Sequence, residues 1–238
     1  MRQGAWDYIE KPPTVKTMTA PLVSAMEHRR QARSGRGGAE PFGFAGIAGG
    51  NPKRAQCLEQ AAKAAQSDVN VLLTGPTGVG KELFARAIHD NSPRRARAFV
   101  VVDCAALPPG IVESVLFGSE KGVYTGADRR REGVLLRAHE GTLFLDEVAE
   151  MPLSVQKAFL RVLQERRVRP VGGLEEAPCH FRLVAATNQN LEAMAAEGLF
   201  REDLLFRLQG VGIELPSLAG HPDDILDFAA HFAAEAAN

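Results

Sequence analysis

Residues 75–81 constrain the fold of this chain more than any other segment. They read Gly75-Pro76-Thr77-Gly78-Val79-Gly80-Lys81 and fit the pattern GxxxxGK, with an apolar run before them at residues 69–73 and a helical pattern after them. In that context, glycines let successive backbone N–H groups and a helix N-terminus approach an anion, and the lysine adds a point charge. The pattern predicts a phosphate-binding loop. A structural glycine-rich turn is the alternative interpretation.

An acidic pair is the second candidate element of this site. Asp146 and Glu147 follow an apolar strand pattern at residues 142–145, and ligands of open α/β sheets bind beyond the C-terminal ends of the strands. Glu82 stands where a Ser or Thr commonly offers a hydroxyl to Mg²⁺, so the metal must use other oxygens. We expect Asp146 to hold Mg²⁺, directly or through water, and Glu147 to orient and polarise an attacking water. An exposed acidic pair at a strand end remains the alternative.

A polar pair, Thr187 and Asn188, follows another apolar run at residues 181–186. At the same edge of a sheet, these side chains could hydrogen-bond a γ-phosphate or the attacking water. The pair is equally typical of a turn or a helix cap, and the residues alone do not decide between the two.

Apolar segments alternate with helical patterns along most of the chain. Strand patterns lie at residues 69–73, 98–102, 142–145, 181–186 and 212–215, and helical patterns at 53–66, 81–89, 153–165 and 201–208. This alternation predicts an α/β fold in which a parallel sheet is covered by helices on both faces.

Composition limits the class of protein. With 45% hydrophobic and 24% charged residues in 238, the chain is typical of a soluble globular protein with a sizeable core. A formal net charge of -1 gives no global field toward nucleic acid or an anionic membrane. Cys57, Cys104 and Cys179 are odd in number and lack CxxC spacing, which argues against a disulfide framework or a zinc site. Without a targeting segment or an apolar span, we expect a cytoplasmic protein.

The ends of the chain differ from its centre. Residues 1–33 are too few to bury a core alone, so we interpret them as the tail of a domain. Residues 34–43 form the body of a flexible linker rich in Gly and Arg, for which a nucleic-acid patch is the less favoured interpretation.

Several further motifs resemble the NtrC-like AAA+ activators of sigma-54 RNA polymerase. The segment Phe-Gly-Ser-Glu-Lys-Gly-Val-Tyr-Thr-Gly-Ala at residues 117–127 is similar to that family's FGxEKGAFTGA, and residues 200–208 resemble its FREDLYYRL. Ile-Glu-Leu-Pro-Ser-Leu at residues 213–218 is similar to its IxLPPL. The resemblance covers residues 44–228, which implies a P-loop AAA+ core with ATP and Mg²⁺ as cofactors. The family also carries a Glu after the P-loop lysine, as at Glu82.

The resemblance implies partners and further site residues. Arg201 and Arg207 match arginine fingers that reach the neighbouring subunit's γ-phosphate, so the active form would be a homo-oligomer, a hexamer in that family. Asp103 stands where many relatives have an Asn that holds the catalytic Glu, and a carboxylate there would repel Glu147. The loop that touches sigma-54 corresponds to Gly122, Val123, Tyr124, Thr125, Gly126 and Ala127. Val123 and Tyr124 depart from the family's Ala and Phe.

The N-terminal residues resemble the last strand of a response-regulator receiver domain, with Lys11 as its phosphate-contacting lysine. By that resemblance, residues 1–33 are a receiver remnant, residues 229–238 begin a lid, and the chain is truncated at both ends. DNA and a cognate sensor kinase would be contacted through domains absent from the chain.

We therefore expect an ATP-hydrolysing activator that remodels the sigma-54 closed complex in a two-component system. Two alternatives stay open: an AAA+ ATPase that acts on another client, and a catalytically silent regulatory fragment.

Overall fold

The computed structural model describes residues 52–123 and 129–217. The predictions for residues 1–33, 34–43, 124–127 and 229–238 lie outside these residues. One compact unit, Gln56–Pro216, contains nearly everything described below.

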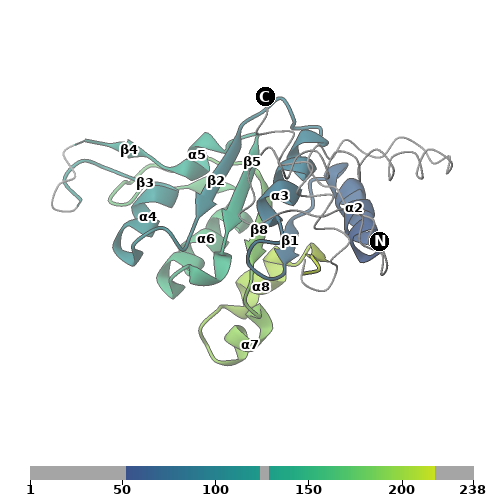
Figure 1. Ribbon diagram of the computed structural model, residues 1–238. Helices are drawn as coiled ribbons and strands as arrows, with labels where there is room; N and C mark the ends of the chain where they lie inside the picture. Colours follow the sequence, from purple (N-terminus) through teal and green to yellow (C-terminus); the bar gives the residue numbers. More distant parts are fainter. Residues whose placement is uncertain (1–51, 124–128, 218–238) are drawn as a thin grey trace, which may run out of the picture. The chain divides into compact units, whose positions relative to one another are not determined.

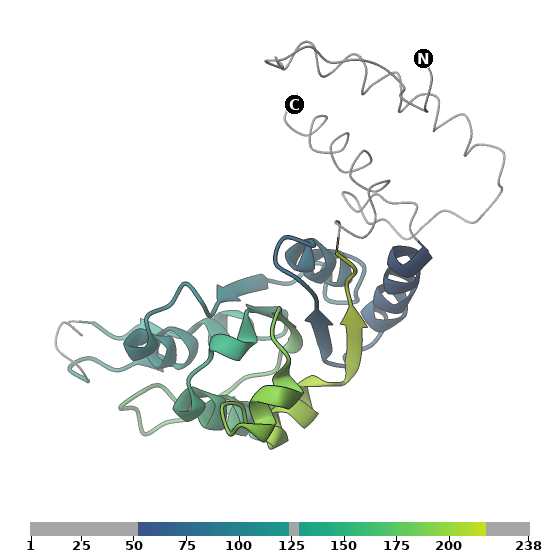
Figure 2. The ribbon, with the colours of Figure 1, turned by 60° about the horizontal axis from the view of Figure 1, so that its bottom comes forward.

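Five parallel strands form the central sheet, in the order β2, β5, β8, β1 and β9 (Figure 1). Each of the five predicted strands is present, with its ends shifted by one or two residues. Their bounds are Val71–Thr74 for β1, Phe99–Asp103 for β2, Thr142–Asp146 for β5, Arg182–Thr187 for β8 and Val211–Glu214 for β9. Figure 2 shows β9 beside β1, with α8 leading into it.

The four predicted helices are also confirmed. They are α2 at Pro52–Ala65, α3 at Lys81–Asp90, α6 at Leu153–Glu165 and α8 at Glu202–Leu208. The sequence did not predict α4 at Pro109–Phe117, α5 at Val134–Arg137, α7 at Leu191–Ala196 or the short 3₁₀ turn η1 at Val148–Glu150. Apart from α4, these elements are too short to show a helical period, and α4 is apolar over most of its length.

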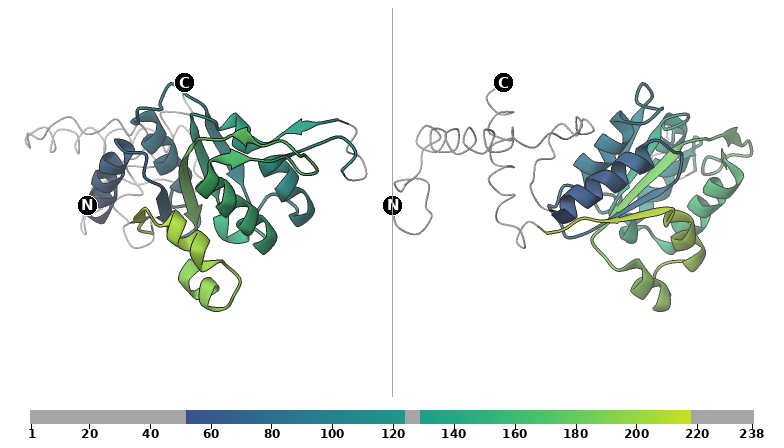
Figure 3. Two further views of the ribbon diagram at one scale, coloured as in Figure 1. Left: turned by 180° about the vertical axis from the view of Figure 1, so that it is seen from behind. Right: turned by 90° about the vertical axis from the view of Figure 1, so that its right-hand side faces the viewer.

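Both faces of the sheet are buried, as expected of parallel strands covered by helices. On one face, Leu72, Leu143 and Leu183 join the core formed with α4, α5, α6 and α8. Side chains that alternate with these, including Leu73 and Phe144, are fully buried on the other face, which α3 covers. Figure 3 shows α2 and α3 on one side of the sheet and α6 and α8 on the other, so the predicted fold class is confirmed.

Two small antiparallel sheets project from this core. In one, β3 (Gly118–Ser119) pairs with β4 (Arg131–Glu132), and in the other β6 (Arg167–Val168) pairs with β7 (Ala177–Pro178). A bridge between Ser119 and Val171 connects them. The segment that leads into the predicted sigma-54 loop is therefore tied to the β6–β7 hairpin.

Parallel register brings the strand ends to one edge of the sheet. Thr74 pairs with Thr187, and Asp103 pairs with Asp146. Residues that follow these strands can therefore converge on a single site. In the described residues, no helix is long and apolar enough to cross a membrane.

Candidate active site

The predicted phosphate-binding loop connects β1 to α3, as the sequence indicated. Gly75, Gly78 and Gly80 have φ values of 143°, 81° and 92°, in the region that favours glycine. At Gly75 a Cβ would also meet the Leu215 carbonyl oxygen at 2.6 Å, so this position excludes any side chain. The backbone thus takes the conformation that a loop of anion-binding N–H groups requires.

Lys81 is the first residue of α3 and points back into this loop. Its Nζ donates to the carbonyl oxygens of Gly75 at 3.1 Å and Pro76 at 3.4 Å, and lies 3.3 Å from Oε1 of Glu147. Only 6% of its side chain is exposed. A buried ammonium needs oxygen partners, and phosphate oxygens entering the loop would be further partners of the same kind.

Glu147 follows β5 and is held in an uncommon backbone conformation. Its φ of 46° and ψ of 53° are left-handed, which costs a non-glycine residue about 1–3 kcal/mol. Its carboxylate contacts Lys81 through Oε1 and accepts the Asn188 N–H at 3.1 Å through Oε2. The Glu147 carboxylate, which follows β5, therefore contacts both the residue after β8 and the lysine at the end of the loop after β1.

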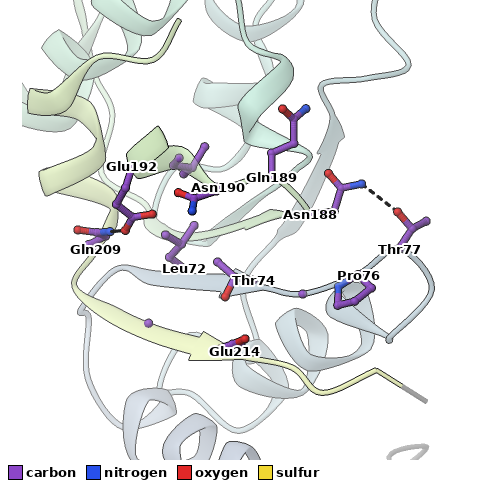
Figure 4. A pocket seen from close by; sticks show the side chains of 13 residues that line it. Leu72, Thr74, Pro76, Thr77, Asn188, Gln189, Asn190, Glu192, Gln209 and Glu214 are labelled. Atoms are coloured by element: carbon purple, nitrogen blue, oxygen red, sulfur yellow. Dashed lines mark hydrogen bonds between the residues drawn. The ribbon is translucent and has the colours of Figure 1, made fainter. Parts of the chain in front are cut away.

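The Asn188 side chain lies across the loop, whereas the Thr187 hydroxyl does not. The Asn188 side-chain amide donates to Oγ1 of Thr77 at 2.9 Å (Figure 4). Thr187 is fully buried, and its Oγ1 accepts the Gln189 N–H at 3.0 Å. Thr187 thus forms the local turn that the sequence left open as an alternative.

Asp146 ends β5 beside the loop, with partial exposure. Burial raises the pKa of its carboxyl, and the charge of Glu147 adds to that shift, while the N–H that Glu147 donates at 3.0 Å opposes it. A divalent cation would remove this penalty, because the ionised carboxylate would then have a counter-charge. A single carboxylate is compatible with Mg²⁺, which keeps several waters and is commonly bound by one or two carboxylates together with phosphate oxygens.

Asp103 is placed opposite Asp146 but does not hold Glu147 in this structure. Its Oδ1 accepts the N–H groups of Ala105 at 2.9 Å and Ala106 at 3.2 Å. Neither of these bonds involves Glu147, and the recorded contacts of the Glu147 carboxylate within the described residues are those with Lys81 and Asn188. The Asp103 charge also helps, after burial and the Glu147 charge, to raise the pKa of Asp146.

Arg201 and Arg207 lie away from the loop, at the two ends of α8. Arg201 is held in a fork by Asp203, with contacts of 3.0 and 2.7 Å, and remains 38% exposed. Arg207 donates to the Leu163 carbonyl oxygen on α6 at 3.3 Å. In the described residues, these recorded side-chain contacts join neither arginine to the loop of residues 75–81.

A hollow of about 820 Å³ adjoins the start of the loop. Figure 4 shows it between Thr74, Pro76 and Thr77 on one side and Asn188, Asn190 and Glu192 on the other. Residues of α7 and of the edge strand β9 also line it. Glu82 points elsewhere: it is exposed on α3 and lies 4.0 Å from Arg86.

Comparison with known proteins agrees with this geometry. Residues 47–214 match the sigma-54 interaction domain, which is well over half of the chain. The chain belongs to the sigma-54 interaction domain family. This places it among NtrC-like sigma-54-dependent regulators, of which it covers the AAA+ region.

Several relatives in this family are similar over nearly the whole chain. The transcriptional regulatory protein GlrR of Escherichia coli K12 is 41% identical over 99% of this chain and 52% of its own length. The DNA-binding transcriptional regulator NtrC of Klebsiella pneumoniae is 40% identical over 97% of this chain and 49% of its own. The crystal structure of NtrX from Brucella abortus in complex with ATP has a TM-score of 0.71 and 36% identity, covering 94% of this chain and 48% of that one.

The chain therefore spans about half the length of the curated relatives it matches. Family membership was predicted from motifs and is confirmed. The roles of single residues, including those of the P-loop glycines and both arginines, remain predictions.

Sequence reasoning missed one polar residue at this site, Gln156 on α6. It is fully buried, and its Oε1 accepts the backbone N–H of Arg201. A glutamine on the apolar face of an amphipathic helix, one turn before Phe159 and Leu160, was the available signal.

Proposed function

We propose that this chain binds MgATP at the loop of residues 75–81 and hydrolyses ATP at the interface between subunits, to remodel sigma-54 RNA polymerase. One observation carries the proposal: the Glu147 carboxylate is fixed between Lys81 and the Asn188 N–H at the mouth of a glycine-lined loop. A carboxylate so placed can accept a proton from a water beside the phosphate that Lys81 binds.

The chain's own residues divide the work as follows. Loop N–H groups and Lys81 bind the β- and γ-phosphates, and Asp146 would hold Mg²⁺, whose charge neutralises phosphate oxygens. Glu147 orients the attacking water. The Asn188 side-chain amide, which donates to Thr77 in this structure, would bind the γ-phosphate. Phosphoryl transfer in P-loop enzymes uses these groups together with a further positive charge that stabilises the transition state at the γ-phosphate.

Arg201 and Arg207 would supply that charge to the neighbouring subunit. A guanidinium is always ionised and offers several donors in a plane, which suits a phosphate. The recorded side-chain contacts of both arginines lie within α8 and on α6 and not at the loop of residues 75–81, so in this proposal a second copy of the chain completes the site. A closed ring, a hexamer in the resembled family, satisfies every site at once.

The sigma-54 contact would be made by residues 122–127. The described part of this segment ends at Val123, which packs on the β6–β7 connection at Gly172. Tyr124 offers one aromatic contact between two glycines. In the whole protein, further domains would contact DNA and a sensor kinase, as the resemblance implies.

ATP turnover against protein concentration tests the catalytic part of this proposal. Specific activity should rise with concentration, because each site needs a neighbour. Lys81→Ala should abolish turnover, and Lys157→Ala, which removes an exposed lysine on α6, should leave it unchanged. If the wild-type chain hydrolyses ATP no faster than buffer alone at every protein concentration, the result favours the catalytically silent fragment.

Binding to sigma-54 distinguishes the proposed client from others. The chain should retain purified sigma-54 in the presence of an ATP transition-state analogue, and Tyr124→Ala should weaken retention without lowering ATP turnover. If ATP is hydrolysed but sigma-54 is not bound under any nucleotide condition, the ATPase acts on another client.

A further inference from the structure

Gln156 is a buried amide in an otherwise apolar part of α6. It has 0% exposure, and its neighbours along the helix, Val155, Phe159 and Leu160, are buried core residues. A buried amide without hydrogen bonds costs several kcal/mol relative to water, so a side chain of this kind must be satisfied by its surroundings. The contacts of Gln156 therefore show what it holds in place.

The side chain spans two separate segments of backbone. Its Nε2 donates to the Met151 carbonyl oxygen at 2.8 Å and to the Leu199 carbonyl oxygen at 3.3 Å. Its Oε1 accepts the N–H of Arg201 at 2.9 Å. Both donors and the acceptor are thus used, and all three partners are main-chain groups, which side-chain motion cannot displace.

One of these segments leads to the catalytic carboxylate. Met151 follows η1, and hydrogen bonds from the N–H groups of Glu150 and Met151 to the carbonyls of Glu147 and Val148 tie it to the residue after β5. The other segment starts α8, where Arg201 is the N-cap residue and buried Phe200 precedes it. Gln156 therefore joins the Glu147 side of the molecule to the residue that carries the proposed arginine finger.

Few side-chain contacts position the Arg201 guanidinium. It is exposed, and its recorded side-chain contacts are the two with Asp203, two positions along the same helix. Its direction thus follows the main chain at the start of α8, and a misplacement of about 1 Å in a catalytic group can cost a hundredfold in rate. A group that fixes the main chain at Arg201 therefore also positions the guanidinium.

We propose that Gln156 is a positioning residue for catalysis in the neighbouring subunit: its amide fixes the backbone of Arg201, and so the guanidinium that reaches across the interface. This inference rests on the proposed function of Arg201. It assigns Gln156 no contact with nucleotide, so nucleotide affinity should not depend on it.

The first test is Gln156→Met, which keeps the volume and removes all three hydrogen bonds. We expect kcat for ATP to fall about tenfold to a hundredfold, with the Kd for ATP changed less than about twofold. Gln66→Met is the control, because Gln66 is exposed and its single bond goes to Asn91. If Gln156→Met does not fold, Gln156→Glu decides: it keeps an acceptor for the Arg201 N–H and should lose less than Arg201→Ala.

Subunit mixing separates positioning of Arg201 from an effect on the same subunit's Glu147. Glu147→Gln subunits lack the carboxylate but keep a correctly placed Arg201. Mixed with Gln156→Met subunits, or with Gln156→Glu subunits if the first variant does not fold, they should restore turnover above the sum of the two separate preparations. A purely structural defect, or one acting through Met151 and Glu147, would not be rescued.

The outcomes assign failure to one proposal or the other. Wild-type kcat in Gln156→Met, a kcat in Gln156→Glu as low as that of Arg201→Ala, or no rescue on mixing overturns the role of Gln156. If instead Arg201→Ala hydrolyses ATP as the wild type does, or the wild-type chain has no turnover, the proposed function itself fails.

Discussion

Lys81 and Glu147 form an ion pair at the mouth of the phosphate-binding loop, with Nζ 3.3 Å from Oε1. Both side chains are largely buried, with exposures of 6% and 19%. Phosphate oxygens that bind Lys81 compete with this carboxylate, while the Asn188 N–H continues to hold its other oxygen. Nucleotide binding would thus release the Glu147 carboxylate from its counter-ion and leave it free to accept a proton from water.

This relationship predicts opposite effects of Glu147→Gln on binding and on catalysis. The neutral amide competes less for Lys81, so ATP should bind at least as tightly as to the wild type. Hydrolysis should fall about a hundredfold or more, because the proton acceptor is lost. Equilibrium binding of a fluorescent ATP analogue and steady-state turnover measure the two effects, with Glu175→Gln, an exposed position, as control. Weaker ATP binding would contradict the competition.

Asp146→Asn should stabilise the metal-free chain and abolish hydrolysis. Because burial raises the pKa of Asp146, the folded chain binds this proton more tightly than the unfolded chain does. The stabilising effect of the protonated form is present at low pH and is lost as pH rises through the raised pKa. At neutral pH in EDTA, the variant should therefore melt at a higher temperature than the wild type.

Thermal unfolding at a series of pH values checks the sign of that effect. The difference between Asp146→Asn and the wild type should shrink as pH falls toward the Asp146 pKa. Mg²⁺ with ATP should raise the melting temperature of the wild type more than that of the variant. A variant less stable than the wild type in EDTA at neutral pH would contradict the burial argument.

Gly172→Ala should loosen the contact between the two small sheets. Gly172 has a φ of 74°, and a Cβ there would meet Cγ2 of Val123 at 2.4 Å. We expect a loss of about 1–3 kcal/mol in the free energy of unfolding, from backbone strain and from the clash together. Gly198→Ala is a matched control, since Gly198 has a φ of 73° and nothing within 4 Å of its Cβ position.

A double-mutant cycle isolates the Val123 contact. Val123→Ala should restore part of the stability lost in Gly172→Ala and none of that lost in Gly198→Ala. For each glycine, denaturant unfolding of the wild type, the two single variants and the double variant gives the coupling free energy. Additive effects would show that Val123 of the predicted sigma-54 loop does not pack on Gly172.

The buried cysteines should be unreactive in the native chain. Cys57, Cys104 and Cys179 are buried, and burial raises the pKa of both Cys104 and Cys179 to about 12. Since the thiolate is the reactive form, Ellman's reagent at pH 8 should label these thiols slowly in buffer and quickly in denaturant. Fast labelling of native Cys104, which follows Asp103 at the site, would contradict the packing described for the end of β2.

Local patterns predicted the parts of this protein whose physical causes are local. The loop of residues 75–81 is recognisable because glycine spacing, a preceding strand and a following helix lie within about twenty residues. Asp146 and Glu147 could be placed at the sheet edge because a strand and its end are read directly from the chain. Family motifs then identified Arg201 and Arg207, which no local pattern singles out.

Long-range contacts account for what the sequence did not reveal. Gln156 reaches Arg201 across 45 positions, and Asn188 reaches Thr77 across 111. The sequence allowed the Thr187 hydroxyl either to face the nucleotide or to bond its own turn. In the structure it accepts the N–H of Gln189. The six-residue helix α7 depends on a cap by Asn190 rather than on any periodicity.

The central claim is that a site held by Lys81 and Glu147 of one subunit is completed by Arg201 of the next. Mixing Glu147→Gln subunits with Arg201→Ala subunits tests it most directly through ATP turnover. Each preparation should be inactive alone. An equal mixture should regain about one quarter of the wild-type rate, because that fraction of random interfaces pairs an intact Glu147 with an intact Arg201. A mixture no more active than its separate components would contradict the account.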